Sequence, residues 1–362
     1  MLAKSVFNFQ INLTLYFNKN VMKLSVEDFL EKSKTVPLID VRTPAEYNKG
    51  HIPGAYNIPL LSNEERAIVG TMYKQEGKEP AFEKALEFSG PNMVSFVREA
   101  KKKAIDNKLL VYCWRGGMRS GSMAWLFNAA GIESHTLDGG YKAFRRHIHA
   151  AFDTTKKIIV LGGYTGSGKT EILKELSKQV QVVDLEGFAR HKGSAFGFIG
   201  QSEQPTTEQF ENNLGTEWLK LNPDKDIWLE DESRNIGRVY LPDSIYNKIR
   251  NARVIFIEIP KDKRIKRLIK DYAGYDDKLL QKAIDKIKKR IGGHRYQLAT
   301  KALKNKDYWE VADIALSYYD KAYLFGLNKR EKEKIFKLRI IDNNPGKVSK
   351  IILDYYQSLN IF

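Results

Sequence analysis

The sequence predicts two α/β domains, each built on a parallel sheet, with a basic helical part in its C-terminal half. Apolar runs that suit buried strands alternate with amphipathic helical runs, and this alternation begins twice along the chain. In each half a glycine-containing turn follows an apolar run, after Tyr112 and after Leu161. Lysine and arginine are concentrated in residues 253–306. These three observations define the predicted architecture.

The composition limits the classes of protein that fit. A chain of 362 residues with 42% hydrophobic and 29% charged residues is long enough for two or three globular domains. Its single cysteine excludes an intramolecular disulfide and a cysteine-rich metal site, and fits a reducing, cytoplasmic location. No apolar run reaches the length of a membrane span, so no membrane partner is expected. Residues 1–22 lack the pattern of a signal peptide and are interpreted as an extension, with Met22 as a second candidate start.

The first domain is assigned to residues 23–150. Ser25 is a plausible N-cap of a first helix, and Pro44 suits the first position of a second. Apolar patterns predict strands at three places, and the short loop-and-strand stretch 50–59 adds another; the three runs are 37–42, 109–112 and 133–137. Such alternation of strands and helices predicts a parallel sheet, in which ligands bind at the carboxyl ends of the strands.

Cys113 lies at one of these strand ends. It follows the strand 109–112 and precedes a predicted helix over 120–130. The turn between them can wrap its N–H groups around an anion, and two cations add to its positive potential. These features favour the thiolate, the form in which a cysteine is a nucleophile. The alternative is a buried, inert cysteine. The glycines and cations of the turn are Gly116, Gly117, Arg115 and Arg119.

Less chemistry is expected between this loop and the second domain. The glycines of Asp138-Gly139-Gly140 are interpreted as a tight turn before a helix from Lys142. Residues 151–156 resemble a linker. Four histidines have neither triad-like nor metal-like spacing and are taken as ordinary polar residues; they are His51, His135, His147 and His149.

The second domain is assigned to residues 151–362 and opens with a phosphate-binding motif. A short apolar strand, 157–161, runs into a glycine-rich loop, and a helix is predicted over 171–178. The loop has the spacing Gly, four residues, Gly-Lys-Thr in the strand–loop–helix context that a P-loop requires. The N–H groups of the loop would bind a diphosphate. The lysine would contact the outer phosphate, and the threonine hydroxyl would help to bind Mg²⁺. The residues assigned to this site are Gly163, Gly166, Ser167, Gly168, Lys169 and Thr170.

Such a site also needs an acidic residue at a second strand end to orient the metal ion. Asp184 and Asp231 each follow an apolar run. Asp231 is the preferred metal ligand together with Thr170, because three successive acids, Glu230 to Glu232, are not all expected to be buried. Asp184 is expected across the cleft.

A surplus of positive charge indicates a polyanionic partner. The formal net charge is +16, and residues 253–306 hold 17 Lys and Arg against 6 Asp and Glu. This single-sign excess lies on helical patterns and favours a nucleic-acid surface. The alternative is an ordinary solvated helix face.

The first half resembles a rhodanese domain over residues 23–150. The resemblance depends on Leu38-Ile39-Asp40-Val41-Arg42, Glu46-Tyr47, Gly50-His51-Ile52-Pro53-Gly54-Ala55 and the cysteine loop ending at Arg119. Rhodanese domains carry sulfur or selenium on the loop cysteine. Here five residues separate Cys113 from Arg119, one more than in the common sulfurtransferase loop. The longer loop is similar to that of dual-specificity phosphatases, and it would also suit a phosphate-bearing donor such as selenophosphate.

With the P-loop domain directly after it, the chain resembles the tRNA 2-selenouridine synthases over most of its length. Several further segments contribute: Asp184-Leu185-Glu186-Gly187, His191-Lys192-Gly193-Ser194-Ala195-Phe196-Gly197 and Glu230-Asp231-Glu232-Ser233-Arg234-Asn235-Ile236-Gly237. The resemblance implies conversion of wobble 2-thiouridine in tRNA to 2-selenouridine. Geranyl diphosphate would first alkylate the sulfur, and selenium from selenophosphate would then displace the S-geranyl group.

The resemblance also implies roles for single residues. Cys113 would attack or carry selenium, while Arg119 and the loop N–H groups hold the phosphate moiety. Lys169 and Mg²⁺ would assist departure of diphosphate, so the P-loop does not by itself imply ATP. The segment 253–306 would bind the anticodon arm. Two other functions stay open: a cysteine-dependent phosphatase or sulfurtransferase regulated by a nucleotide-binding domain, and a nucleic-acid-binding regulator in which Cys113 senses oxidants.

Overall fold

The computed structural model describes residues 21–154, 156–342 and 344–359, so most of the predicted N-terminal extension, 1–22, lies outside the described residues. The chain divides into two compact units, Met1–Ala150 and Ala151–Phe362. Both contain a parallel sheet with helices, which confirms the predicted fold class. Within the described ranges no helix is long and apolar enough to cross a membrane.

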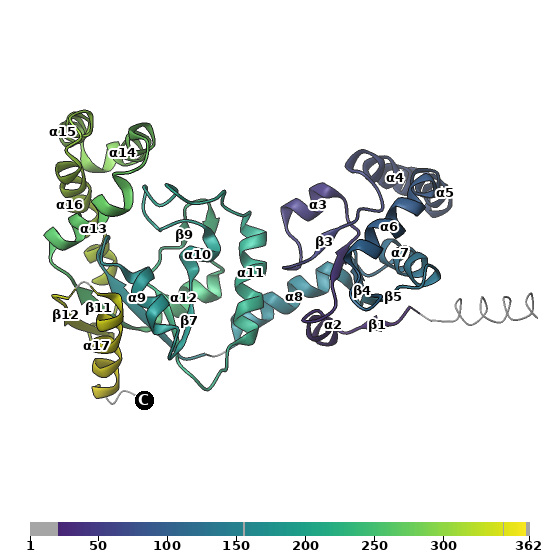
Figure 1. The fold of residues 1–362 in the computed structure, drawn as a ribbon, viewed down its shortest axis with the longest axis horizontal. Helices are drawn as coiled ribbons and strands as arrows, with labels where there is room; N and C mark the ends of the chain where they lie inside the picture. The colour runs from purple at the N-terminus through teal and green to yellow at the C-terminus, as the bar shows by residue number, and fades with distance from the viewer. Residues whose placement is uncertain (1–20, 155, 343, 360–362) are drawn as a thin grey trace, which may run out of the picture. The chain divides into compact units, whose positions relative to one another are not determined.

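The first unit, drawn in purple to blue in Figure 1, contains a five-stranded parallel sheet. Its strand order is β1-β5-β4-β2-β3. Its strands are β1 (Lys23–Leu24), β2 (Leu38–Asp40), β3 (Tyr56–Asn57), β4 (Lys108–Tyr112) and β5 (Glu133–Leu137). Its helices are α2 (Val26–Lys32), α3 (Pro44–Lys49), α4 (Asn63–Gln75), α5 (Lys78–Ser89), η1 (Gly90–Asn92), α6 (Met93–Lys103), α7 (Met118–Ala129) and α8 (Gly140–Asp153). The central strand β4 is buried from Leu109 onward and carries Cys113 at its carboxyl end.

Local sequence explains these helix starts. Ser25 caps α2, accepting the Asp28 N–H, and Thr43 forms a capping box with Glu46 ahead of Pro44 in α3. The expected linker is wrong at its start, because α8 continues to Asp153. The physical reason is apolar spacing: Phe144, Ile148 and Phe152 recur every fourth residue and all are fully buried.

The second unit has a five-stranded parallel sheet in the order β12-β11-β6-β8-β7 and a separate hairpin of β9 and β10. Its strands are β6 (Ile158–Gly163), β7 (Gln181–Val183), β8 (Ile227–Glu230), β9 (Asn235–Ile236), β10 (Val239–Tyr240), β11 (Arg253–Glu258) and β12 (Ile335–Arg339). Its helices are α9 (Lys169–Leu176), α10 (Leu185–Ala189), α11 (Thr207–Lys220), α12 (Asp243–Asn251), α13 (Lys261–Tyr272), α14 (Asp277–Ile291), α15 (Gly293–Lys304), α16 (Tyr308–Leu327), η2 (Lys332–Lys334) and α17 (Pro345–Ser358).

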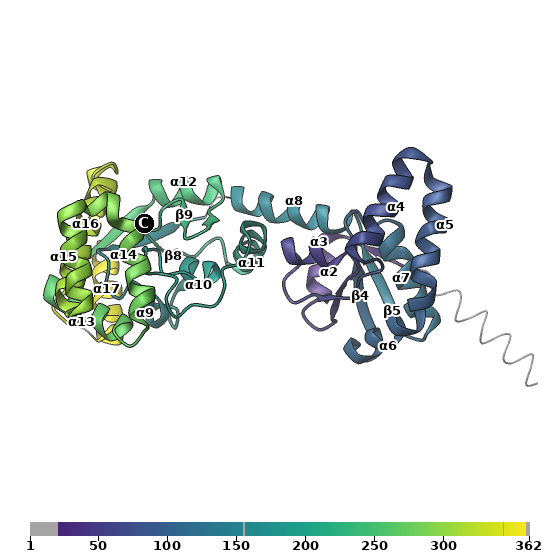
Figure 2. The same ribbon diagram turned by 90° about the horizontal axis from the view of Figure 1, so that it is seen from above.

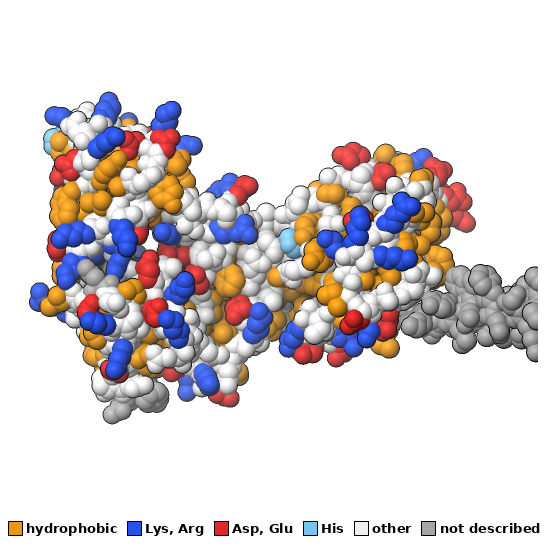
Figure 3. All heavy atoms as spheres, viewed as in Figure 1, with side chains coloured by type: hydrophobic (Ala, Val, Ile, Leu, Met, Phe, Trp, Pro, Cys, Tyr) orange, Lys and Arg blue, Asp and Glu red, His pale blue; other side chains and the backbone are white. Residues whose placement is uncertain are grey.

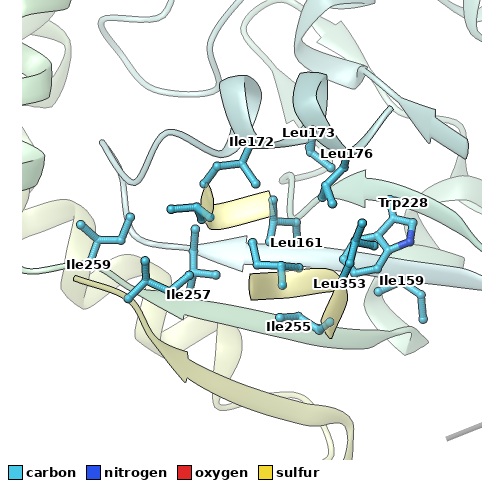
Figure 4. Close-up of a cluster of buried hydrophobic side chains, with 13 residues drawn as sticks. Ile159, Leu161, Ile172, Leu173, Leu176, Trp228, Ile255, Ile257, Ile259 and Leu353 are labelled. Carbon is cyan, nitrogen blue, oxygen red and sulfur yellow. The ribbon is translucent and has the colours of Figure 1, made fainter. Parts of the chain in front are cut away.

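The core beside this sheet fixes the helix that carries the P-loop. Ile172, Leu173 and Leu176 of α9 pack with Leu161 of β6 and Leu353 of α17 in one buried cluster (Figure 4). Burial of such aliphatic side chains contributes about 1.5–3 kcal/mol each. The loop between β6 and α9 is therefore held at both ends by buried elements.

Helices α13 to α16 gather at one end of the second unit (Figure 2). Their inner sides form an apolar cluster that includes Ile284 and Ile287 of α14, Leu303 of α15 and Ile314 of α16. Lysine and arginine side chains stand out over α14 and α15 on the face shown in Figure 3. The basic segment is thus a set of amphipathic helices with its cations mostly outside and an apolar core inside.

Candidate functional site

The cysteine loop is the candidate site of the first unit. Cys113 follows β4 directly and is buried, and its Sγ lies 3.2 Å from the hydroxyl of Ser120 in the first turn of α7. The loop bends at Gly116, which has φ +62°. The Ser120 hydroxyl can donate its one hydrogen either to Sγ or to the Gly117 carbonyl, which also lies 3.2 Å away. Sequence reasoning had not assigned Ser120 a role, although it follows Arg119 directly.

The glycine turn after β5 forms the second wall of this loop. The Tyr141 N–H donates to the Cys113 carbonyl at 2.8 Å and the Lys142 N–H to the Trp114 carbonyl at 3.0 Å. A Cβ at Gly140, where φ is +58°, would lie 2.4 Å from the Cys113 carbonyl oxygen and from the Gly116 nitrogen. Gly140 is therefore required for close contact with the cysteine loop as well as for the turn.

Arg119 has an internal counter-ion in the described structure. Its guanidinium contacts both carboxylate oxygens of Glu46, at 2.7 and 3.3 Å. Burial opposes ionisation of Glu46, but the hydrogen bond and charge of Arg119 prevail and lower its pKa. Arg115 is exposed. The two predicted cations thus differ, since one is paired with the N-terminal turn of α3 and the other faces solvent.

The Asp-Val-Arg motif has a structural role. Arg42 is fully buried, donates to Asp40 at 2.6 Å and to the Gly50 carbonyl at 2.7 Å, and lies 3.8 Å from the ring centre of Tyr141. It therefore joins the segment after β2 to the glycine turn beside Cys113. Val41 of the same motif packs in one buried cluster with Cys113, so the motif supports the cysteine loop from two sides.

The P-loop of the second unit lies between β6 and α9. Gly166 and Gly168 have φ +80° and +76°, conformations that suit glycine. The Lys169 ammonium donates to the Gly163 carbonyl at 3.0 Å, and the Thr170 hydroxyl donates to Glu186 at 2.9 Å. The predicted P-loop residues are thus together on one loop, with the lysine and threonine in place to meet a phosphate and its cation.

Two arginines of α13 hold the outside of this loop. Arg264 is buried, forms a bidentate ion pair with Asp320 at 2.9 and 2.8 Å, and donates to the Thr165 carbonyl at 3.1 Å. Arg267 donates to the Gly166 carbonyl at 3.2 Å. Part of the basic segment therefore supports the P-loop, a role that no spacing in the sequence indicates.

Three acids at the end of β8 are all largely buried, contrary to the sequence expectation. Glu230 is 0% and Glu232 8% exposed, and the Asp231 side chain is 5% exposed. Their partners differ. Glu230 accepts the Leu185 N–H at 3.2 Å through Oε2, whereas its Oε1 is buried without a hydrogen-bond partner in the described structure. Glu232 shares a hydrogen bond with Glu186. Burial raises the pKa of Glu230, Glu232 and Glu186, so this cluster favours protons or a cation.

Asp231 has different neighbours. Its carboxylate accepts hydrogen bonds from Arg330 at 2.5 Å and from the Tyr323 hydroxyl at 2.7 Å, and Arg250 lies 3.7 Å away. The same Tyr323 hydroxyl accepts the Gly163 N–H at 3.1 Å. Its assignment to a metal stays a prediction, and these contacts favour a positioning role at the start of the P-loop.

Glu186 and Glu232 suit a metal ion better than Asp231 does. Asp184 caps α10 by accepting the Gly187 N–H at 2.7 Å. Within the described part of the chain no group of three or more His, Cys, Asp or Glu is arranged to hold a metal ion alone. Mg²⁺ at a phosphate site commonly takes only one or two protein ligands. Thr170, Glu186 and Glu232 offer oxygen donors of that kind beside Lys169.

An apolar pocket opens beside the P-loop. Thr165 of the loop lines it, together with apolar side chains of α13, α14 and α16 such as Leu268, Leu280 and Ala315. This arrangement suits a ligand that consists of a hydrocarbon group and a diphosphate. The apolar side chains would contact the hydrocarbon, and the P-loop would bind the diphosphate.

A second, polar groove of about 1050 Å³ lies on the same unit. Ser194 and Tyr319 line both the groove and the apolar pocket. Six cations and one acid line the groove: Arg190, Arg234, Arg238, Lys282, Lys286, Arg290 and Glu203. The P-loop, the apolar pocket and this basic groove are therefore connected through shared wall residues.

The two units define a rhodanese-like domain joined to an AAA-type P-loop domain. Residues 24–147 match the family model of the rhodanese-like domain, and residues 156–343 match that of the tRNA 2-selenouridine synthase AAA domain. On these matches the chain belongs to the tRNA 2-selenouridine synthase family, a family of tRNA-modifying enzymes.

Curated relatives agree with this assignment. The tRNA 2-selenouridine synthase of Nitrosomonas europaea is 33% identical, over 83% of this chain and 91% of the relative. Those of Nitrosomonas eutropha and Shewanella woodyi are each 34% identical, over 83% of this chain and 91% and 90% of the relatives. The resemblance stated from the rhodanese motifs and the P-loop is confirmed.

Proposed function

We propose that the protein converts wobble 2-thiouridine of tRNA to 2-selenouridine through S-geranyl-2-thiouridine, using geranyl diphosphate and selenophosphate. Membership of the family supports the modification of tRNA. The observation that carries the geranyl step is the apolar pocket, which shares Thr165 with the phosphate-binding loop. The phosphates of a nucleotide would fit the P-loop equally well, but a nucleotide has no hydrocarbon chain to fill this pocket.

In the first step the sulfur of 2-thiouridine bonds to C1 of the geranyl group as the C1–O bond breaks. Diphosphate takes the bonding pair, and the uracil N3 proton is released. Lys169 and the N–H groups of the loop stabilise the charge that develops on the leaving oxygen. Thr170, with Glu186 and Glu232, would hold Mg²⁺, which supplies further charge stabilisation when bound. Loss of the lysine removes stabilisation made mainly in the transition state.

In the second step Cys113 acts on selenophosphate. Its thiolate attacks phosphorus, the P–Se bond breaks, and selenium leaves with the bonding pair as hydroselenide. Hydroselenide attacks C2 of the S-geranyl uridine, geranylthiol leaves, and water hydrolyses the phosphocysteine to phosphate. The contact of Ser120 with Sγ and the phosphatase-like length of the loop support this route, because they suit a thiolate that attacks and later departs.

The test is mass analysis of tRNA nucleosides after incubation with the full chain, geranyl diphosphate and selenophosphate. Lys169→Ala should leave 2-thiouridine unchanged, since it blocks alkylation. Cys113→Ser should accumulate S-geranyl-2-thiouridine without selenouridine. Selenouridine formed by the cysteine variant would contradict the role of Cys113, and geranylated tRNA at the wild-type level in the lysine variant would contradict that of Lys169. Phosphate released from an aryl phosphate without tRNA would instead favour the phosphatase.

A further inference from the structure

The basic groove defined above favours an anion even after its internal ion pairs, Arg238 with Glu203 at 3.6 Å and Arg234 with Asp243, are subtracted. Lys282, Lys286 and Arg290 are spaced four apart on α14 and so lie along one side of that helix. Arg238, from the segment joining β9 and β10, lines the same groove. Burial first, and then the like charges of Lys282 and Arg238, lower the pKa of Lys286. Cations that repel one another in this way are stabilised when phosphates lie between them.

The groove also carries groups that suit bases. Phe198 and Tyr319 supply aromatic side chains, and the Lys286 ammonium lies 4.0 Å from the Phe198 ring centre. Gln201, Ser202 and Asn235 are exposed polar side chains on the same walls. Aromatic rings that stack bases and amides that reach base edges are the means by which proteins bind unpaired RNA. A groove of about 1050 Å³ also lies at the upper end of the size range of sites for one small molecule.

The junction of the groove with the apolar pocket indicates where a reacting base would lie. Tyr319 accepts the Ala195 N–H at 2.9 Å, which fixes the segment that carries Ser194. Ser194 and Tyr319 line both cavities, and Thr165 joins the pocket to the P-loop. A base at this junction would meet the C1 end of a prenyl chain whose diphosphate is on the loop.

From this geometry we propose that the basic groove binds the single-stranded loop of a tRNA hairpin and places the target uridine at Ser194 and Tyr319. This proposal rests on the proposed function and deepens it, because it replaces the whole segment 253–306 by one groove that takes three cations from that segment and three, Arg190, Arg234 and Arg238, from outside it. The arginines of α13 that hold the P-loop are not part of it.

The test compares two double variants of the full chain that each remove two positive charges from the basic helices. Lys282→Ala with Lys286→Ala changes the groove, whereas Lys301→Ala with Lys304→Ala changes exposed lysines of α15 outside it. The probe is a fluorescent RNA hairpin with the anticodon loop. The groove variant should weaken binding by about 10- to 100-fold and reduce the salt slope of log K by about 1.4, since two phosphate contacts with single-stranded RNA are lost. The control should stay within about twofold of wild type.

A second measurement locates the base. A hairpin with photoreactive 4-thiouridine at the wobble position should crosslink to peptides containing Ser194 or Tyr319. Equal loss of binding in both double variants, or crosslinks confined to the first unit, would refute the proposal that this groove binds the RNA. Both measurements use neither geranyl diphosphate nor selenophosphate. Normal RNA binding without nucleoside conversion would therefore refute the proposed chemistry and leave the groove in place.

Discussion

The variant Asp231→Ala distinguishes between two roles of this carboxylate, a structural ion-pair partner and a metal ligand. The Asp231 and Arg330 side chains are 5% and 1% exposed, and their ion pair is 2.5 Å long. Removing one partner of a buried pair costs about 3–5 kcal/mol, because the other charge stays buried without compensation. Arg330 also donates to the carbonyls of Ile249 and Arg250, at 2.6 and 3.0 Å, but these hydrogen bonds do not neutralise it.

The stability loss should appear in the second unit. At roughly 2–4 °C per kcal/mol for a domain of this size, the melting temperature of Asp231→Ala should fall by about 6–20 °C. Urea unfolding followed by tryptophan fluorescence measures the same change, since Trp218 and Trp228 are fully buried in that unit. Trp114 and Trp125 are 37% and 50% exposed, so unfolding of the first unit changes their surroundings less.

Asp243→Ala is the matched control. Asp243 pairs with Arg234 at the surface, where the two side chains are 72% and 58% exposed, and such pairs contribute about 0–1 kcal/mol. The reasoning would be refuted if Asp231→Ala unfolded within about 1 kcal/mol of this control while losing its dependence on Mg²⁺. That result would support the role of metal ligand that the sequence predicted for Asp231.

Two further predictions concern the pocket and the groove. Ala315→Phe fills the apolar pocket, so calorimetry should show about tenfold weaker binding of geranyl diphosphate, which corresponds to the loss of roughly two buried CH₂ groups. Binding of inorganic diphosphate should be unchanged. Equal weakening of both ligands would mean that the pocket does not bind the geranyl chain. Burial and the charge of Lys286 lower the pKa of His191 from 6.5 to about 4. The folded state therefore binds fewer protons than the unfolded one, and stability is lost as pH falls through this window. Urea unfolding should show a smaller loss between pH 6.5 and 4 for His191→Gln, and identical pH profiles would contradict a neutral, buried histidine.

Much of the fold was readable because the decisive signals are local. The strand before Cys113 and the strand before the P-loop are short apolar runs that end at glycine-containing turns. Positive φ values at Gly116, Gly166 and Gly168 are consequences of those turns and need no distant partner. For the same reason the positions of Lys169 and Thr170 followed from the motif alone.

The roles of neighbouring charged residues were not readable, because partners far along the chain decide them. Asp231 and Glu232 are adjacent, yet one meets Arg330 and Tyr323 and the other meets Glu186. Local spacing contains no information on these contacts. The segment 253–306 shows the same limit, since Arg264, within a run of cations, is buried against Asp320. A charge excess predicts a polyanion partner only after such internal pairs are subtracted.

The segment 191–197 shows why the resemblance extends beyond the two loops. A Cβ at Gly193, where φ is +64°, would lie 2.9 Å from carboxylate oxygens of both Glu186 and Glu232. The next residue, Ser194, lines both the apolar pocket and the basic groove. Glycine is thus needed where the segment passes the acidic cluster, and a small polar residue suits the wall between an apolar pocket and a polar groove. A larger residue at Gly193 would meet the acidic cluster and the groove, and one at Ser194 would meet the pocket and the groove, so this segment is constrained on more than one side.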